Sequence, residues 1–260
     1  MTLSLLQAVL GLACGLLVGF SLGLVGGGGS ILAVPLLVYV VGLDSPHIAI
    51  GTSAIAVAVN AAANLFSHAR AGNVKWRCAS VFAASGVIGA FAGSTFGKMV
   101  NGQSLLALFA VMMIVVGALM LRTGSGEGKP DVHLGRENVF QLAGLGFAAG
   151  ALSGFFGIGG GFLIVPGLLL ATGMPILNAI GSSLVAVTAF GLTTAANYAY
   201  SGLVDWTLAA VFVGGGLLGG LLGARSAKHL AKTKGALNTI FAVVIFVVAI
   251  YMLVRSLNLV

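Results

Sequence analysis

Long apolar segments alternate with short polar connectors along the whole chain. About 20 consecutive apolar residues are enough for one helix to cross the hydrocarbon core of a bilayer, and several of these segments reach that length. They cover roughly residues 3–25, 31–42, 48–67, 78–97 and 104–121, and then 139–156, 162–173, 176–199, 204–224 and 236–254. The pattern therefore predicts an all-α, polytopic membrane protein.

Two of the segments, 31–42 and 162–173, are too short to cross a bilayer as straight helices. Each has about 12 residues, or roughly 18 Å of helix, against a hydrocarbon thickness of about 30 Å. A glycine-rich run precedes each of them. We therefore predict re-entrant or broken helices at these two places, and the sequence leaves open whether they cross fully. Non-helical backbone at membrane depth requires surrounding protein or a wet cavity to satisfy its polar groups.

The second half of the chain repeats the residue order of the first. A shift of 131 positions superimposes Gly23, Gly26, Gly28, Gly29 and Pro35 on Gly154, Gly157, Gly159, Gly160 and Pro166. A shift of 130 positions superimposes Ile50, Gly51, Ser53, Trp76 and Lys98 on Ile180, Gly181, Ser183, Trp206 and Lys228. Internal repeats of this kind are typical of secondary transporters. We expect a first repeat over 1–122, a polar connector over 123–137 and a second repeat over 138–260, with four to five helical segments in each repeat.

The distribution of lysine and arginine indicates that the two repeats are inverted in the membrane. Short loops rich in these residues tend to remain on the cytoplasmic side. If the glycine-rich runs turn the chain back, ten of the twelve basic residues share one side and only Lys98 and Arg255 lie opposite; if they do not, the division is seven against five. We therefore expect inverted repeats in the cell membrane, with both termini outside the cytoplasm.

Composition supports the membrane assignment and excludes several classes of function. Hydrophobic residues make up 59% of the chain and charged residues 7%, whereas soluble domains carry roughly 25% charged residues. The net charge of +7 comes from residues between apolar segments, so it does not indicate nucleic-acid binding. Cys14 and Cys78 show no pairing or metal-binding spacing. No catalytic set, metal cluster or cofactor motif is present, so we expect neither an enzyme nor a bound cofactor.

The glycine-rich runs are the first candidates for a substrate site. A helix that begins after such a run directs free backbone amides and the positive end of its dipole toward the turn, which favours an anion. Ser30 is a suitable N-cap for the first short helix. The alternative is that the glycines serve only a turn or close packing. The candidate residues are Gly26, Gly27, Gly28, Gly29 and Ser30 in the first repeat, and Gly157, Gly159, Gly160 and Gly161 in the second.

Polar side chains inside the predicted spans are the second group of candidates. They are Thr52, Ser53, Asn60 and Asn64 in the third segment, and Ser182, Ser183 and Asn197 in its counterpart. Asn60 and Asn64 are four residues apart and share one helical face. Because a buried amide is costly without a partner, these side chains are expected to face the substrate path or, equally well, to join neighbouring helices.

Glycines recur at every fourth residue in four of the segments. The ladders include Gly11, Gly15, Gly19 and Gly23 near the start, and Gly215, Gly219 and Gly223 near the end. Small residues at this spacing let helices approach closely in lipid. We expect these faces to hold helices together, and a homodimer through them is a further possibility.

These motifs together resemble the TauE/SafE family of membrane permeases. The resemblance rests on Gly26–Gly29 with Pro35, on Gly157–Gly161 with Pro166, and on the paired motifs at 51–53 and 181–183. It implies export of sulfite, sulfoacetate or related organosulfur anions, with the bilayer and a small anion as the partners. The leading hypothesis is an anion exporter that works by alternating access at the repeat interface. A non-transporting membrane scaffold or assembly protein, or an anion channel, is the alternative.

Overall fold

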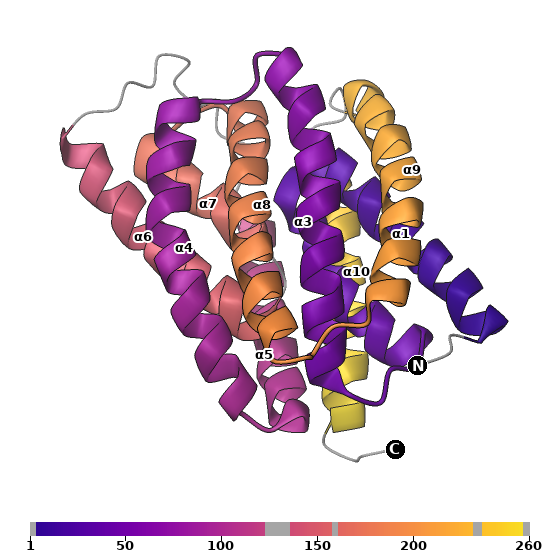
Figure 1. Ribbon diagram of the computed structural model, residues 1–260. Helices are drawn as coiled ribbons and strands as arrows, with labels where there is room; N and C mark the ends of the chain where they lie inside the picture. The colour runs from indigo at the N-terminus through magenta and orange to yellow at the C-terminus, as the bar shows by residue number, and fades with distance from the viewer. Residues whose placement is uncertain (1–3, 123–135, 158–160, 231–235, 257–260) are drawn as a thin grey trace.

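Helices form at each of the ten predicted segments. The computed structural model describes residues 4–122, 136–157, 161–230 and 236–256 (Figure 1). The helices are α1 (Leu5–Val25), α3 (Pro46–Arg70), α4 (Trp76–Met99), α5 (Gly102–Arg122), α6 (Arg136–Phe156), α7 (Gly161–Thr172), α8 (Ile176–Tyr200), α9 (Trp206–Leu230) and α10 (Ala236–Ser256), with a composite helical segment between α1 and α3. The all-α prediction is confirmed, and the chain has no strand in the described residues.

Six of the helices are long and apolar enough to cross a membrane, counting only the described part of the chain. They are α1, α3, α4, α6, α8 and α9. Shorter apolar helical stretches cover Gly29–Val40, Gly102–Ala118, Leu163–Thr172 and Ile245–Arg255. Two of these four stretches lie in the segments that were predicted to be too short to span.

The segment after α1 combines three kinds of helix. It begins as a 3₁₀ helix, η1 (Gly26–Leu32), continues through a single α turn, α2 (Ala33–Pro35), and ends as a π-helix, η2 (Leu36–Val40). Glycine is a poor α-helix former and proline lacks the backbone N–H, so an irregular helix is the expected outcome. Since helical backbone already begins at Gly26, Ser30 lies inside η1, and its prediction as an N-cap is wrong.

Gly26 is the residue at which the chain reverses. Its φ of +70° lies in the left-handed region that favours glycine. Beyond it, Gly29 packs back against the backbone of Ser21 and Leu22 in α1, and the Ser21 hydroxyl donates to the Gly29 carbonyl oxygen at 3.4 Å. Helix α1 and the composite segment that follows it therefore form a helical hairpin.

The glycine ladders hold pairs of helices in close contact within the chain. Gly15 and Gly19 of α1 face the carbonyl oxygens of Phe212 and Gly216 in α9. In the same way, α4 and α6 pack through glycines on both helices, as Gly150 shows by facing the carbonyl oxygen of Gly86. Close backbone approach of this kind stabilises helix pairs where lipid removes the hydrophobic drive. The homodimer expected through such faces stays a prediction.

Two long helices, α3 and α8, lie side by side in the middle of the bundle and run in opposite directions (Figure 1). The Asp205 amide, just after α8, donates to the Thr52 hydroxyl near the start of α3 at 3.0 Å. At the other end, the Lys75 amide, just after α3, donates to the Ser182 hydroxyl near the start of α8 at 2.9 Å. Each helix therefore begins beside the end of the other.

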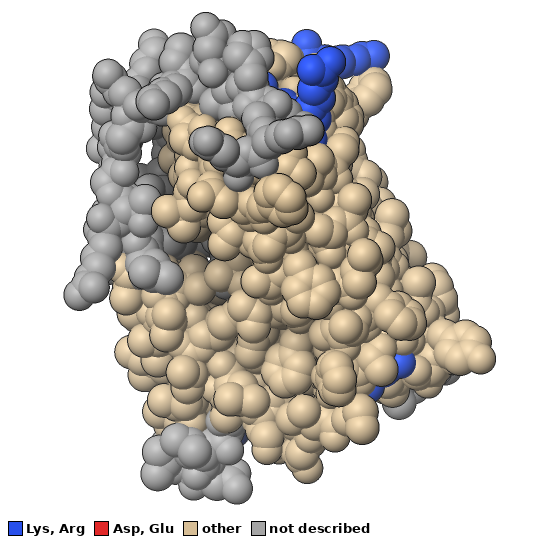
Figure 2. Space-filling view, turned by 90° about the vertical axis from the view of Figure 1, so that its left-hand side faces the viewer, with Lys and Arg blue, Asp and Glu red and all other residues tan. Residues whose placement is uncertain are grey.

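Basic side chains gather at one end of the molecule. On the face shown in Figure 2, a cluster of lysine and arginine lies at the upper end, a smaller group lies near the lower end, and the surface between them carries no described charge. At the more basic end, Arg70 ends α3, Lys75 lies in the connection to α4, and Arg77 lies in the first turn of α4. An uncharged band between two polar ends is the surface expected of a protein that crosses a bilayer.

Candidate functional site

Two glycine turns contact the central helices α3 and α8. Gly26 ends α1 with a φ of +70°, and Gly157 follows α6 with a φ of +69°. A Cβ atom at Gly26 would lie 2.7 Å from Cγ2 of Ile180 in α8, and one at Gly157 would collide with Ile50 in α3. The short helical segments that follow the turns, η1 and α7, also pack against one another. The two turns therefore lie toward opposite ends of the α3–α8 pair, and it is the segments after them, η1 and α7, that contact each other.

The residues of the two glycine runs are described to different extents. Gly29 and Ser30 are buried, and Gly27 and Gly28 contribute backbone to η1. In the second run Gly161 is the buried first residue of α7, whereas Gly159 and Gly160 lie outside the described residues. Because a helix begins at Gly161, its first backbone amides lack intrahelical partners, and this is the arrangement that favours an anion.

The hydroxyl groups near the starts of α3 and α8 contact backbone. Thr52 and Ser182 accept from the amides of Asp205 and Lys75, as described above. Ser53 donates to the Ile50 carbonyl oxygen at 2.9 Å and to that of Gly157 at 3.5 Å, so it also contacts the second glycine turn. Ser183 donates to the Ile180 carbonyl oxygen at 2.8 Å. For Thr52 and Ser182 the interhelical alternative is the one the contacts support.

Asn60 and Asn64 face the glycine ladder of α9 from the middle of α3. Asn64 donates from Nδ2 to the Asn60 carbonyl oxygen at 2.9 Å, and its amide lies against Gly220. Asn60 packs against Gly216, is completely buried, and both polar atoms of its side chain have no hydrogen-bond partner among the described residues. Leaving a buried polar group unpaired costs about 1–3 kcal/mol. Among the predicted site residues that the structure describes, Asn60 is therefore one whose side-chain amide makes no hydrogen bond to the described residues.

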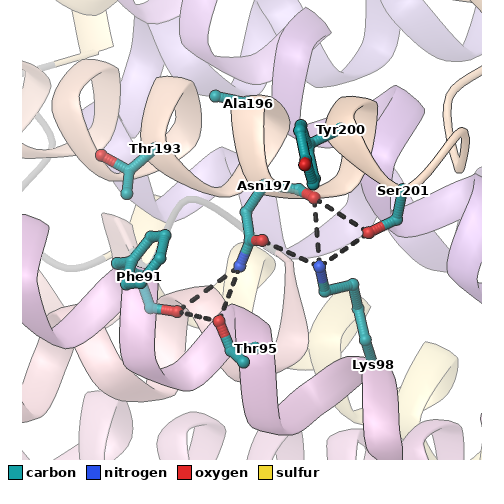
Figure 3. Close-up of a pocket in the computed structure, with 8 residues that line it drawn as sticks. All are labelled: Phe91, Thr95, Lys98, Thr193, Ala196, Asn197, Tyr200 and Ser201. Atoms are coloured by element: carbon teal, nitrogen blue, oxygen red, sulfur yellow. Dashed lines mark hydrogen bonds between the residues drawn. The ribbon is translucent and has the colours of Figure 1, made fainter.

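Asn197 belongs to a polar cluster on the opposite side of the central pair. Its side-chain oxygen accepts from Lys98 Nζ at 2.8 Å, and its Nδ2 donates to Thr95 at 3.0 Å (Figure 3). The same Nδ2 also donates to Ser94 at 2.6 Å. Lys98 also donates to the Asn197 backbone oxygen at 3.1 Å and to the Ser201 hydroxyl at 2.8 Å. Sequence reasoning did not select Lys98 as a site residue, although its isolation on the less basic side was a signal.

The comparisons with known proteins decide the family. The family model described as "Sulfite exporter TauE/SafE" matches residues 11–252 of the chain. The chain belongs to the TauE/SafE sulfite exporter family. It is 54% identical to a probable membrane transporter protein of Xylella fastidiosa strain Temecula1 over 244 residues, which are 92% of each chain.

More distant relatives cover most of the TauE/SafE chain as well. The probable membrane transporter protein YunE of Bacillus subtilis is 27% identical over 81% of this chain and 85% of its own. A probable membrane transporter protein of Haemophilus influenzae is 26% identical over 94% of this chain and 97% of its own. No solved structure matches the chain. This protein is therefore a multi-pass membrane transporter of the TauE/SafE family and not an enzyme.

Proposed function

We propose that this TauE/SafE protein exports small organosulfur anions, such as sulfite or sulfoacetate, by alternating access between two inverted repeats. The observation that carries the proposal is the pair of glycine turns, at Gly26 and Gly157, that lie toward opposite ends of the α3–α8 pair and lead into two segments, η1 and α7, that contact each other. After the second turn α7 begins at Gly161, and the first backbone amides of a helix favour an oxyanion. The family description names sulfite exporters, which supports the same class of substrate.

The inverted-repeat part of the proposal is supported by contacts that recur about 130 residues apart. Gly26 packs on Ile180 and Gly157 on Ile50; Gly51 faces the Leu203 carbonyl oxygen and Gly181 that of Asn73. The Thr52–Asp205 and Ser182–Lys75 hydrogen bonds form a third matched pair. Since α3 and α8 are antiparallel, an axis in the membrane plane relates the two halves, which are residues 1–122 and 138–260. Inverted repeats of this type occur in many secondary transporters.

We further propose that the basic end faces the cytoplasm and that both termini lie outside it. Basic loops next to membrane spans tend to stay in the cytoplasm. Ala71→Cys and Ser201→Cys place a thiol in exposed positions 130 residues apart, and the native Cys14 and Cys78 are buried. In intact cells a membrane-impermeant maleimide should label the cysteine at 201 and leave that at 71 unlabelled. The reverse labelling, or labelling of both, would overturn the orientation.

Asn60 is the residue that we propose to contact the anion during transport. It lies in the middle of α3, where a carrier with two inverted halves places its substrate. In this structure its amide is covered by Gly216 of α9. Separation of α9 from α3 would uncover the amide, and its N–H groups would then donate to the oxygens of a sulfonate or sulfite. Closing the interface would release the anion.

Flux into proteoliposomes tests the transport activity. Sulfite, sulfoacetate, sulfate and chloride are offered separately to vesicles that contain the purified protein, and empty vesicles are the control. We expect saturable flux of sulfite or sulfoacetate, because a carrier has a limited number of sites. Flux that rises linearly with concentration would favour a channel instead. Absence of flux for the whole panel would favour the scaffold alternative and overturn the proposal.

A further inference from the structure

A pocket of about 570 Å³ lies between α4 and α8, near the ends of both helices. Figure 3 shows its residues, which come from two turns of each helix. Lys98, Asn197 and Ser201 occupy the end of the pocket toward the less basic side of the molecule. Phe91 and Thr193 lie farther along the helices, toward the middle of the membrane. The pocket therefore has a charged end and a more apolar end.

The pocket opens on the outer surface of the helical bundle. Phe91 is 59% exposed and Tyr200 is 95% exposed. Both helices are apolar and long enough to cross the bilayer, so the medium next to their exposed side chains is lipid rather than bulk water. An aromatic ring and a lysine near the end of a span are groups that sit at the level of lipid headgroups. A membrane lipid is thus the molecule that reaches this pocket first.

Lys98 carries a positive charge, and the hydrogen-bond acceptors around it in the described part of the chain are all neutral. Its three hydrogen bonds go to the backbone oxygen and the side-chain oxygen of Asn197 and to the Ser201 hydroxyl. Dipoles of this kind orient the ammonium group but do not cancel its charge. Ser201 is exposed, so it is the acceptor that a ligand can most readily replace. An anionic oxygen at that position would form a charge-assisted hydrogen bond, which is stronger than the bond to a hydroxyl.

We propose that this pocket binds the phosphate of an anionic phospholipid. Lys98 Nζ contacts a phosphate oxygen in place of Ser201, and the Ser201 hydroxyl, which donates to the Asn197 backbone oxygen at 3.3 Å in this structure, turns to donate to the same phosphate. One acyl chain lies along Phe91 toward the middle of the bilayer. Basic pockets between membrane helices bind anionic headgroups in this manner. The lipid would thereby hold the ends of α4 and α8 together from outside the bundle.

The thermal stability of the purified full-length protein tests the proposal. Unfolding is followed in a neutral detergent with added phosphatidylglycerol or with phosphatidylcholine of the same acyl chains. We expect phosphatidylglycerol at roughly tenfold its dissociation constant to raise the Tm by about 3–5 °C, and phosphatidylcholine to raise it far less. Lys98→Gln should remove most of the difference between the two lipids. Lys98→Arg, which keeps the charge, should retain it.

Arg255→Gln is the matched control, because Arg255 is the other basic residue on the less basic side and lies over the Tyr251 ring at 5.9 Å. It should keep the full lipid-dependent difference. A full difference in Lys98→Gln, or an equal loss in Arg255→Gln, would overturn the proposal. The measured quantity is an increment on each variant's own Tm, so a variant that is merely less stable does not imitate the expected result.

Glycerol 3-phosphate and sulfite, each at millimolar concentration without lipid, separate a lipid site from a site for a soluble anion. Neither compound should raise the Tm of the wild-type protein more than that of Lys98→Gln. A Lys98-dependent rise with either compound but not with phosphatidylglycerol would assign the pocket to a soluble anion and overturn the lipid proposal. The outcome is independent of the flux measurement, so failure here leaves the proposed transport activity untouched.

Discussion

Two helix contacts with the same backbone arrangement differ in the side chain that each contains. Asn60 of α3 packs against Gly216 of α9, and Phe190 of α8 packs against Gly86 of α4. The two pairs are related by a shift of 130 positions in both helices. Phe190 stacks on Phe82 with ring centroids 6.3 Å apart, whereas the Asn60 amide has no hydrogen-bond partner among the described residues. The space beside a helix glycine at equivalent positions is thus filled by an aromatic ring in one half and by an amide without a described partner in the other.

The difference shows that the fold does not require an amide at this place. A buried ring next to a glycine contributes packing, while an unpaired buried amide costs about 1–3 kcal/mol. Polar groups that lower stability and make no structural hydrogen bond occur at functional sites. The Asn60 contact is therefore the one that we assign to transport, and the Phe190 contact is the one that we assign to structure.

The largest expected effect comes from filling the glycine gap at the structural contact. In Gly86→Ala the new methyl group would collide with the Phe190 ring and lie 2.7 Å from the Gly146 carbonyl oxygen. Overpacking of this kind costs about 1–3 kcal/mol and occasionally more, and we expect about 3 kcal/mol because the ring is held by Phe82. The midpoint of thermal unfolding in detergent measures the loss.

Gly214→Ala is the control for the added methyl group, since nothing lies within 4 Å of that position in α9. It should leave the unfolding midpoint unchanged or raise it slightly, because alanine is the better helix former by about 1 kcal/mol. An equal loss in Gly86→Ala and Gly214→Ala would show that the Phe190 contact is not close-packed.

The next effect separates stability from transport at Asn60. Asn60→Leu replaces the unpaired amide by an apolar side chain of similar size, so we expect stability to rise by about 1–2 kcal/mol. The same change should lower sulfite flux by about tenfold to a hundredfold, which corresponds to the loss of one hydrogen bond to an anion at about 1.5–3 kcal/mol. Thermal unfolding and proteoliposome flux measure the two quantities.

Phe190→Leu is the matched variant on the other side of the comparison. It should lower stability by about 1–2 kcal/mol through lost packing, while flux per folded molecule stays near the wild-type value. Unchanged flux in Asn60→Leu would contradict the assignment of Asn60 to the anion. A fall in stability in that variant would instead show that the amide is structural.

The smallest effects concern the two hydrogen bonds that connect the ends of α3 and α8. Thr52→Val and Ser182→Ala each leave a backbone amide without its acceptor, and we expect each to cost about 1 kcal/mol. Because the two bonds lie at opposite ends of the helix pair, their costs should add in the double variant. Thermal unfolding of the three variants measures this. Clearly unequal costs would show that the two ends are not equivalent.

The positions of the helices followed from the sequence because segment length and apolar composition are local properties. The short segments at 31–42 and 162–173 were predicted for the same reason, and η1–η2 and α7 lie there. The N-cap at Ser30 was predicted wrongly. The glycines before it adopt a 3₁₀ helix that packs on α1, and this contact is not visible in local propensity.

The candidate site was predictable as a set of residues but not as an arrangement. The glycine runs, Asn60 and Asn197 could be selected because polar and glycine-rich positions stand out in apolar helices. The sequence did not separate their roles. Thr52 and Ser182 accept hydrogen bonds from loop amides, and Asn60 has no hydrogen-bond partner among the described residues, although all three are small polar residues in similar surroundings along the chain.

The sequence by itself determined a polytopic helical membrane protein with paired glycine motifs, because hydropathy, helix breaks and residue order are local properties of consecutive residues. Only the tertiary structure decided which polar groups find partners. Lys98 and Asn197 are 99 residues apart, and their contact depends on how α4 crosses α8. Within the described residues the Asn60 side chain has no hydrogen-bond partner, because α9 places the backbone of Gly216 against it. Hydrogen bonding at membrane depth is a property of helix packing, and packing is set by contacts between distant parts of the chain.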